Sequence, residues 1–466
     1  MKPNQILILL FTVCFTQNIT SAQIFQTTAS FTDARYGHCT EQAQNDNVLI
    51  FGGFTGSGSN INSVYEYNPN TDLWTAKSSI PNNNGLGNSA SVKLNDGNVL
   101  LFGGSLNGTT PQSNKAYKYI VSTDNWQILN NLPNAVGREQ MSATLINDTT
   151  VLLCGGLTSN VSGLQYQSAC FLYHTQIDSY SLAGNLAHGV IDHSATLLQN
   201  GEVLICGGFD GNAARSEVYV YNRQNGLRTL TTALTTPVSA HMAVEINGKV
   251  YIYGGFNIPN FEYSKNLDVY NPTTDEVQLL NTGPVASSSF SMIAFDSLIF
   301  IAGGNKLLPS GGFGVTNEVN IYNTLTNSFS SFDSLPSMRS NMKLSAIGNS
   351  GKFLLSGGSI SLSQPYDSGI IFDPGQVISG RASTSTANDI KIYPNPVKDM
   401  LFIDLTPFQL ERNKISIFTL MGEKIFEIST YDAMIEIDLS HLNSGNYIIN
   451  ISNSTFSDNK IIKLIK

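Results

Sequence analysis

The chain has 466 residues, of which 41% are apolar and only 13% charged, and its formal net charge is −9. This length allows a large core and more than one domain, and the apolar content excludes a chain that is disordered by composition. The sequence has no basic run, which argues against a nucleic-acid partner, because binding to phosphates requires clustered Lys and Arg. After the N-terminal segment no apolar run reaches about 18 residues, so we expect no transmembrane segment.

Residues 1–22 have the pattern of a secretory signal peptide. Lys2 supplies the positive start, residues 6–15 form the apolar centre, and Thr20-Ser21-Ala22 is a small-residue cleavage site before Gln23. Cys14 lies inside the apolar centre, which is a poor position for a lipid-modified cysteine. We therefore predict a secreted, soluble product that passes through the periplasm.

Four cysteines remain after residue 22: Cys39, Cys154, Cys170 and Cys206. Secretion permits disulfides. Cys154 and Cys206 nevertheless stand at equivalent repeat positions where other copies carry Phe, Tyr, Ala or Ser. The pattern favours small buried hydrophobic residues, and it leaves any pairing of the four cysteines open.

A short apolar run closed by two glycines recurs seven times, with 47 to 54 residues between successive first glycines. A repeat near fifty residues indicates an architecture built from copies of one supersecondary unit. Glycine has no Cβ, so the chain can turn sharply, or another backbone can approach, where each strand ends. The expected structural glycines are Gly52, Gly53, Gly103, Gly104, Gly155, Gly156, Gly207, Gly208, Gly254, Gly255, Gly303, Gly304, Gly357 and Gly358.

An aromatic residue ends a strand-like run 14 to 19 residues after each first glycine: Tyr67, Tyr119, Tyr173, Tyr221, Tyr270, Tyr322 and Phe372. In two copies a tryptophan follows after a turn, Trp74 and Trp126. Gly-Gly, then Tyr, then Trp at these spacings resembles the Kelch repeat. The resemblance covers residues 23–376 and implies one four-stranded β-propeller blade per copy. It predicts seven blades, or six if the last copy forms none.

The last copy lacks a clear fourth strand after residues 370–375, whereas residues 24–31 are strand-like and precede the first complete copy. We predict that this N-terminal stretch pairs with the last blade and closes the ring. Such closure leaves no long exposed sheet edge.

Residues 377–388 are small, polar and aperiodic, which is typical of a linker. In residues 389–466 the Gly-Gly repeat stops and apolar residues alternate with polar ones, as in Leu401/Ile403/Leu405 and Ile435/Ile437/Leu439. The alternation predicts a separate domain, a small Ig-like antiparallel β-sandwich of about seven strands.

This tail carries a second resemblance. Its distinctive residues are the opening Tyr393-Pro394-Asn395-Pro396, Gly422 in a central turn, Gly445 and Tyr447 before a late strand, and the basic end at residues 460–466. The set resembles the C-terminal sorting domain of the bacterial type IX secretion system. The resemblance implies that the type IX machinery is a partner and that the product is secreted or held at the cell surface. The signal peptide agrees with this route, and whether the product is anchored or released stays open.

The start of the predicted innermost strand is the most suggestive position for a site. Alignment of the repeats there gives His38, Asn88, Met141, His193, His241, Phe290 and Asn341. The polar members, His38, Asn88, His193, His241 and Asn341, are candidate binding residues at the mouth of the tunnel. Three imidazoles could hold zinc or copper. A polar residue here commonly bonds backbone where blades meet, so we favour structural histidines, with no metal and no other cofactor.

Kelch-type propellers include enzymes, so catalysis is the rival interpretation. Galactose oxidase-like proteins hold copper with two Tyr and two His, one Tyr being linked to a Cys, and no loop here offers that set. Sialic-acid-processing propellers require clustered arginines. Arg35, Arg138 and Arg339 precede three first strands, where they could instead bridge blades. A phosphate-binding glycine loop, a calcium loop and a Gly-x-Ser-x-Gly elbow are all absent from the sequence.

The sequence thus predicts an all-β protein, a Kelch-type propeller followed by a small sandwich. Loops after the glycine pairs vary most, and residues 257–266 and 305–317 are the most distinctive of them. Variable loops on a rigid scaffold commonly carry binding residues. We expect a non-enzymatic binding or scaffold module for a glycan or a protein, with no assigned catalytic residue. The alternative is an extracellular carbohydrate-active enzyme.

Overall fold

The computed structural model describes residues 24–375 and 391–465, apart from residues 44, 109–111, 161, 259, 309–310, 349, 395–396, 406–412, 420–422, 433 and 453–456. The expected signal peptide (residues 1–22) and linker (residues 377–388) lie outside the described residues. The same holds for Asn395, Pro396 and Gly422 of the sorting motif.

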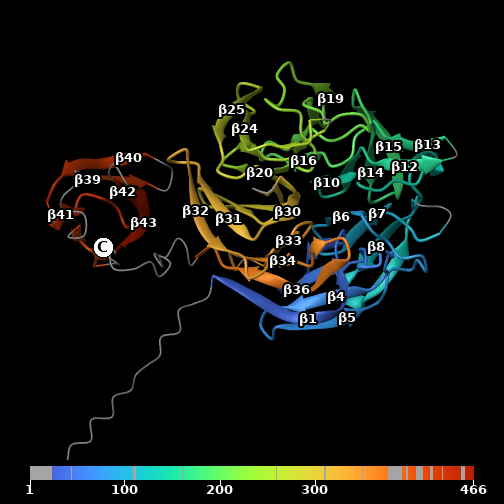
Figure 1. Cartoon of the computed structure of the whole chain (residues 1–466), viewed down its shortest axis with the longest axis horizontal. Coiled ribbons are helices and arrows are strands. Elements are labelled where there is room, and N and C mark those ends of the chain that lie inside the picture. The colour runs from blue at the N-terminus through green and yellow to red at the C-terminus, as the bar shows by residue number, and fades with distance from the viewer. Residues whose placement is uncertain are drawn as a thin grey trace, which may run out of the picture.

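The described residues up to Gly375 form a β-propeller of seven antiparallel sheets, which we call blades, around a central axis (Figure 1). Six blades follow chain order. The first is β2–β5 (Cys39–Gln42, Val48–Phe51, Val64–Asn68, Leu73–Lys77), the second β6–β9 (Ala90–Lys93, Val99–Phe102, Ala116–Ile120, Asn125–Ile128), and the third β10, β11, β14 and β15 (Ser142–Asn147, Thr150–Cys154, Ala169–His174, Ser179–Asn185). The fourth is β16–β19 (Ser194–Leu197, Val203–Cys206, Val218–Asn222, Gly226–Thr229), the fifth β20, β21, β24 and β25 (Met242–Ile246, Lys249–Tyr253, Asn266–Asn271, Glu276–Thr282), and the sixth β27, β28, β31 and β32 (Ser291–Phe295, Leu298–Ala302, Glu318–Asn323, Ser328–Ser334). First strands of adjacent blades pack on one another around the axis, so they are the innermost strands.

The N-terminal strand completes the last blade. This blade runs β33 (Lys343–Ile347), β34 (Lys352–Ser356), β36 (Gln364–Phe372) and then β1 (Phe25–Arg35), with the short β35 (Ser359–Ser361) also paired to β36. Phe25 lies opposite Phe372, and their rings stack with centroids 5.0 Å apart. The predicted ring closure by the N-terminal stretch is confirmed.

The second strand of each blade explains the glycine pairs. These strands are mainly apolar runs, most of whose residues are buried, as in Val48–Phe51, because each blade is covered by its neighbours. Both glycines of all seven pairs have positive φ, for example 59° at Gly52 and 108° at Gly53. A Cβ on Gly52 would lie 2.1 Å from the carbonyl oxygen of Leu86 at the entry to the next blade. The repeat therefore needs glycine both for the turn and for the close approach of the neighbouring backbone.

Five of the six repeated tyrosines are anchored by a residue five positions later. Tyr67, for instance, is buried between blades, and its hydroxyl donates to Asp72 Oδ1 at 2.9 Å. The acceptors share a left-handed backbone at the turn between the third and fourth strands. The pairs are Tyr67–Asp72, Tyr119–Asp124, Tyr173–Asp178, Tyr270–Asp275 and Tyr322–Asn327. Each of these five tyrosines thus fills the interface between blades while its hydroxyl fixes the outer turn.

Residues 391–465 form two further sheets that share no strand with the propeller among the described residues. One contains β37 (Lys391–Tyr393), β38 (Met400–Asp404) and β41 (Met434–Asp438), and the other β39 (Asn413–Thr419), β40 (Lys424–Thr430), β42 (Gly445–Ser452) and β43 (Ser457–Leu464). Alternate residues of both sheets, such as Leu401, Ile417 and Ile449, meet in one apolar core. The predicted alternation is thereby accounted for, because each sheet buries one face.

Candidate functional site

A ring of backbone surrounds one mouth of the central tunnel. Seven residues, one at the entry to each blade, have positive φ: Gly37, Asn88, Gln140, Asp192, Ala240, Ser289 and Asn341. Five of them donate their N–H to the carbonyl of the preceding member, at 2.8 to 3.0 Å: Asn88, Gln140, Ala240, Ser289 and Asn341. The ring links successive blades at this mouth and aims several of its side chains at the tunnel.

The structure corrects the alignment of two candidate residues. Asn88 and Asn341 belong to the left-handed ring and lie one residue before the position that His38, His193 and His241 occupy. The residue equivalent to the histidines in the last blade is Met342, which packs over Gly303 as His241 packs over Gly207. Asparagine is one of the residues that tolerate a left-handed backbone. Asn88 and Asn341 are therefore explained by the turn that precedes each first strand, and they are not equivalents of the histidines. Constant spacing after the arginines (Arg35 to His38, Arg339 to Met342) could have revealed the register.

The three histidines lie at junctions between blades. The Nε2 atom of each is hydrogen-bonded to a serine Oγ of the preceding blade: His38 to Ser356 at 2.8 Å, His193 to Ser142 at 2.9 Å and His241 to Ser194 at 2.9 Å. Each ring also covers the first glycine of that blade's pair.

Burial keeps these imidazoles neutral. It lowers the pKa of His193 to about 4 and that of His241 to about 3, and it lowers the pKa of His38 well below its usual value. The rings serve three separate junctions and do not converge on one point. In the part of the chain that the structure describes, no three His, Cys, Asp or Glu side chains are grouped so that they could hold a metal ion.

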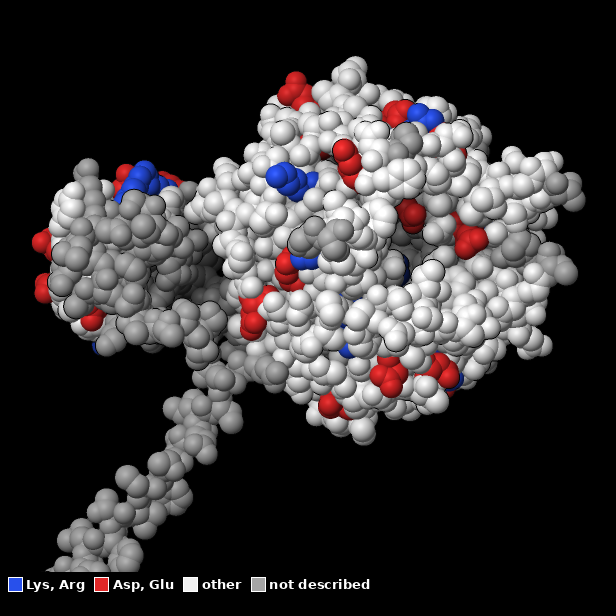
Figure 2. Space-filling model, in the orientation of Figure 1, with Lys and Arg blue, Asp and Glu red and all other residues white. Residues whose placement is uncertain are grey.

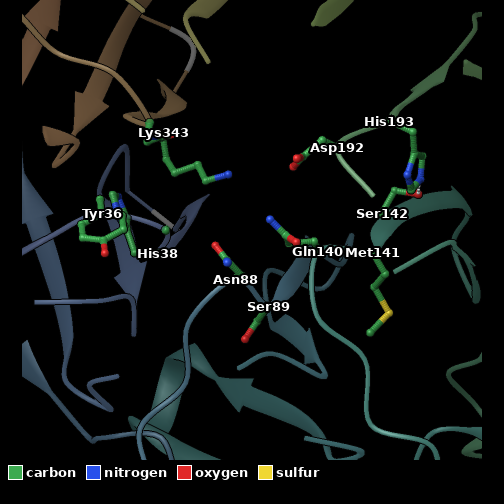
Figure 3. A pocket seen from close by; sticks show the side chains of 12 residues that line it. Tyr36, His38, Asn88, Ser89, Gln140, Met141, Ser142, Asp192, His193 and Lys343 are labelled. Carbon is green, nitrogen blue, oxygen red and sulfur yellow. Dashed lines mark hydrogen bonds between the residues drawn. The ribbon is translucent and has the colours of Figure 1, made fainter. Parts of the chain in front are cut away.

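A hollow of about 380 Å³ opens inside the ring. Its polar lining includes Tyr36, Asn88, Gln140, Asp192 and Lys343, and Figure 3 shows the last four extending toward the same space. Asn341 also lines it. Figure 2 shows this face hollowed at its centre, with charged side chains sparsely scattered around it.

The side chains of the hollow keep their hydrogen-bonding capacity. Among the described residues, the side chains of Asn88, Gln140, Asp192, Asn341 and Lys343 make no hydrogen bond or ion pair with another residue. Asp192 is open to the hollow, yet enclosure by the blades raises the pKa of its carboxyl group, Lys343 opposes that effect and Glu139 adds to it. The mouth thus presents an ammonium group, a carboxyl group and three amides to whatever fills it. Sequence reasoning missed Gln140, Asp192 and Lys343, because their common direction depends on how the blades are placed.

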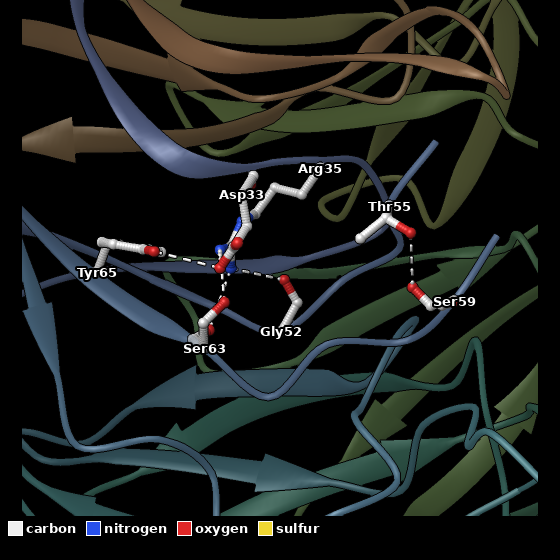
Figure 4. Close-up of polar contacts among 7 residues, drawn as sticks. All are labelled: Asp33, Arg35, Gly52, Thr55, Ser59, Ser63 and Tyr65. Atoms are coloured by element: carbon white, nitrogen blue, oxygen red, sulfur yellow. Dashed lines mark hydrogen bonds and ion pairs between the residues drawn. The ribbon is translucent and has the colours of Figure 1, made fainter. Parts of the chain in front are cut away.

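Each of the three arginines donates hydrogen bonds to backbone carbonyls of a single blade. Arg35 Nη1 donates to the carbonyls of Gly52 at 2.9 Å and Ser63 at 3.1 Å, and its Nη2 donates to Ser63 Oγ at 2.7 Å (Figure 4). Asp33 lies 3.5 Å from the same guanidinium.

Arg138 and Arg339 repeat this arrangement. Each donates to the first glycine carbonyl of a pair, Gly155 or Gly357, and to a carbonyl of the third strand, that of Ala169 at the start of β14 or that of Ser368 within β36. Each arginine therefore holds the connection between the second and third strands. The three do not form a cluster for a carboxylate, as a sialic-acid-processing site would require.

The two distinctive loops lie side by side on the same face as the hollow. Strands β22 (Phe256–Asn257) and β23 (Glu262–Tyr263) form one hairpin, and β29 (Asn305–Leu307) and β30 (Phe313–Val315) form the other. Tyr263 and Phe313 join them with ring centroids 5.8 Å apart, and Phe256 lies 4.9 Å from Tyr263. Phe261 and Phe313 are 63% and 58% exposed, so this aromatic group is open to solvent.

Comparisons with known families agree with this architecture. Residues 58–218 match the Attractin/LZTR1 beta-propeller, residues 35–80 the Kelch motif, and residues 391–466 the secretion system C-terminal sorting domain. The chain is a Kelch-repeat β-propeller protein with a C-terminal sorting domain.

Several curated proteins are similar to a part of this chain. Kelch repeat and BTB domain-containing protein 2 of cowpox virus (strain Brighton Red) is 27% identical over 140 residues, 30% of this chain and 25% of the relative. Kelch domain-containing protein 3 of Homo sapiens is 27% identical over 251 residues, 48% of this chain and 62% of the relative. Kelch-like protein 15 of Mus musculus is 26% identical over 132 residues, 24% and 22% of the two chains. The matched region thus spans less than two thirds of each of these relatives.

The sorting domain points to export by the type IX system to the cell surface or beyond it. Of its expected motif residues, Tyr393 ends β37 and packs against Phe402, with ring centroids 5.9 Å apart, and it is followed by Pro394. Gly445 begins β42, and the Tyr447 hydroxyl donates to the Asn443 carbonyl at 2.8 Å. Across the described residues no helix has the length and apolar character needed to span a membrane.

Proposed function

We propose that this Kelch propeller is a secreted, non-catalytic binding module that holds a segment of a protein ligand over the tunnel mouth. The observation that carries the proposal is the convergence of Asn88, Gln140, Asp192, Asn341 and Lys343 on one hollow without protein partners. Concave sites with a few convergent polar groups are where ligands are held and oriented. We also propose the division into residues 1–22, 23–376, 377–388 and 389–466.

The surroundings of the hollow favour a protein ligand over a glycan. Loops between second and third strands surround it, and they expose Leu164, Leu307 and Leu362 in addition to the aromatic group. Exposed aliphatic and aromatic side chains around orienting polar groups suit a protein surface. A glycan is the other outcome that the experiment below can return.

The carbohydrate-active enzyme has less support. Its required arginines, Arg35, Arg138 and Arg339, are each engaged by backbone carbonyls in separate blades. Of the candidate binding residues, His38, His193, Asn88 and Asn341 line the hollow, whereas His241 does not.

Removal of the charges of Lys343 and Asp192 tests the site. In the Lys343→Ala/Asp192→Asn double variant, we expect affinity for the ligand to fall by at least about tenfold, since a hydrogen bond to a charged group contributes roughly 1.5–3 kcal/mol. The measurement is capture of cell-surface proteins by the immobilised full chain, followed by titration of the captured species. The matched control is Ile177→Ser, which changes an exposed apolar side chain in a turn at the opposite end of the blades.

Treatment of the surface fraction separates the two ligand classes. A protein ligand is lost after proteolysis and survives glycosidase treatment, and a glycan shows the reverse. Equal capture by the parent chain and the double variant would show that the tunnel mouth is not the binding site.

A further inference from the structure

Two cysteines face each other across neighbouring strands of the third blade. Strands β11 and β14 are antiparallel, and Leu153 lies opposite Phe171. One step further along this register brings Cys154 opposite Cys170. Both side chains belong to the same apolar cluster between the third and fourth blades, at 1% and 0% exposure, so they lie on the same side of the sheet. Both are free thiols in this structure.

Of the seven blades, the third alone carries cysteine at both of these positions. The corresponding pairs in the other six blades are Phe51–Val64, Phe102–Ala116, Cys206–Val218, Tyr253–Leu267, Ala302–Val319 and Ser356–Gly369. Cys206 occupies the same place as Cys154, but its partner is valine. The fourth blade therefore provides an internal control for the third.

We propose that Cys154 and Cys170 are joined by a disulfide in the exported protein. Opposed residues of an antiparallel pair have Cα atoms about 4.5–5.5 Å apart, within the range of about 4.4–6.8 Å that a disulfide spans. The sorting domain sends the chain out of the reducing cytoplasm, and disulfides form and persist in the compartments beyond it.

The reaction is a dithiol–disulfide exchange with a protein disulfide oxidant. One cysteine thiolate attacks a sulfur of the oxidant's disulfide and forms a mixed disulfide, and the second thiolate then displaces the oxidant's thiolate. The two cysteines lose two electrons and two protons, and the oxidant becomes a dithiol. Burial raises the pKa of Cys154 well above its usual value, so the folded blade is a poor substrate. The exchange therefore takes place before the third and fourth blades close on each other.

The disulfide would tether a surface hairpin at its base. Strands β12 (Leu157–Asn160) and β13 (Gly163–Tyr166) lie between the two cysteines in the chain, and Leu157 is bridged to Glu139 beside the tunnel-mouth ring. Closing this loop reduces the conformational freedom of the unfolded chain and limits opening of the hairpin in the folded one. The inference does not depend on which ligand the propeller binds.

Thiol counting tests the proposal on the full chain exported to a bacterial periplasm. The protein is denatured without reductant, alkylated with N-ethylmaleimide and weighed intact, and a second sample is reduced first. We expect two more alkylated thiols after reduction than before it. Equal counts in the two samples would overturn the proposal.

Two variants assign the bond. Cys170→Val recreates the Cys206–Val218 pair of the fourth blade, so the blade should fold, and the difference between the two samples should fall from two to zero. Cys206→Val should keep the difference of two. Loss of the difference in Cys206→Val would assign the bond to another pair and would also overturn the proposal. As a second readout, the melting temperature of the parent chain should drop by several degrees on reduction, while that of Cys170→Val should not.

Discussion

At the scale of single residues, one repeat position shows how the propeller varies its blade junctions. The side chain that covers the first glycine of the preceding blade is Met141, His193, His241, Phe290, Met342 or His38 around the ring. Methionine and phenylalanine fill the space by packing alone. Histidine fills it and adds a hydrogen bond to a serine, but it brings a titratable group into a dry interface.

This chemistry predicts acid sensitivity at His241, whose folded-state pKa is lowered to about 3 against about 6.5 in the unfolded chain. As pH falls below 6.5 the unfolded chain binds a proton and the folded chain does not, so stability is lost as pH falls. His241→Met introduces the residue that Met141 and Met342 supply at the same position in two other blades. This variant should reduce the loss of unfolding free energy between pH 7 and 4.5 by about 2–3 kcal/mol. Urea unfolding at both pH values measures it. An identical pH dependence in the variant and the parent would refute the assignment.

At the scale of elements, β1 is the strand on which ring closure depends. It comes from the N-terminus and supplies the outer strand of the blade whose other strands come from residues 343–372. Its buried residues Phe25, Thr28, Phe31 and Arg35 engage both the last and the first blade. A strand of this kind removes an open sheet edge and joins the two ends of the domain.

Truncation of Phe25 tests the closure. Phe25→Ala removes a buried ring that contacts Phe372 and Phe332, and such changes cost about 3–5 kcal/mol of unfolding free energy. We expect a lower chemical denaturation midpoint and faster proteolysis within residues 25–35. Gln26→Ala, one residue along and exposed, should leave both unchanged. If the two variants behave alike, β1 does not hold the ring closed.

At the scale of the whole molecule, the propeller and the sorting domain share neither a sheet nor an apolar cluster among the described residues. The propeller clusters draw on neighbouring blades, as where Leu49 and Phe51 meet Leu101 and Tyr119. The C-terminal sandwich has a cluster of its own. Separate cores allow each part to fold without the other.

Removal of the sorting domain should therefore separate folding from export. A chain that ends before residue 389 should keep the thermal unfolding transition of the propeller and remain in the periplasm, whereas the full chain reaches the surface or the medium. Cell fractionation and calorimetry of the propeller transition measure the two properties. Export of the shortened chain, or loss of the propeller transition, would contradict this division.

The amino-acid sequence by itself determined the repeat, its glycine turns, the closing strand and the sorting tail. These features follow from local sterics and from a period that recurs along the chain: two glycines that need positive φ, and a tyrosine at a set distance after them. Only the tertiary structure decided the tunnel mouth. Gln140, Asp192 and Lys343 come from three blades, and Asn88 and Asn341 lie in the left-handed ring. It also brought Cys154 opposite Cys170, because side-chain direction and strand register depend on how blades and strands are placed, which no local pattern records.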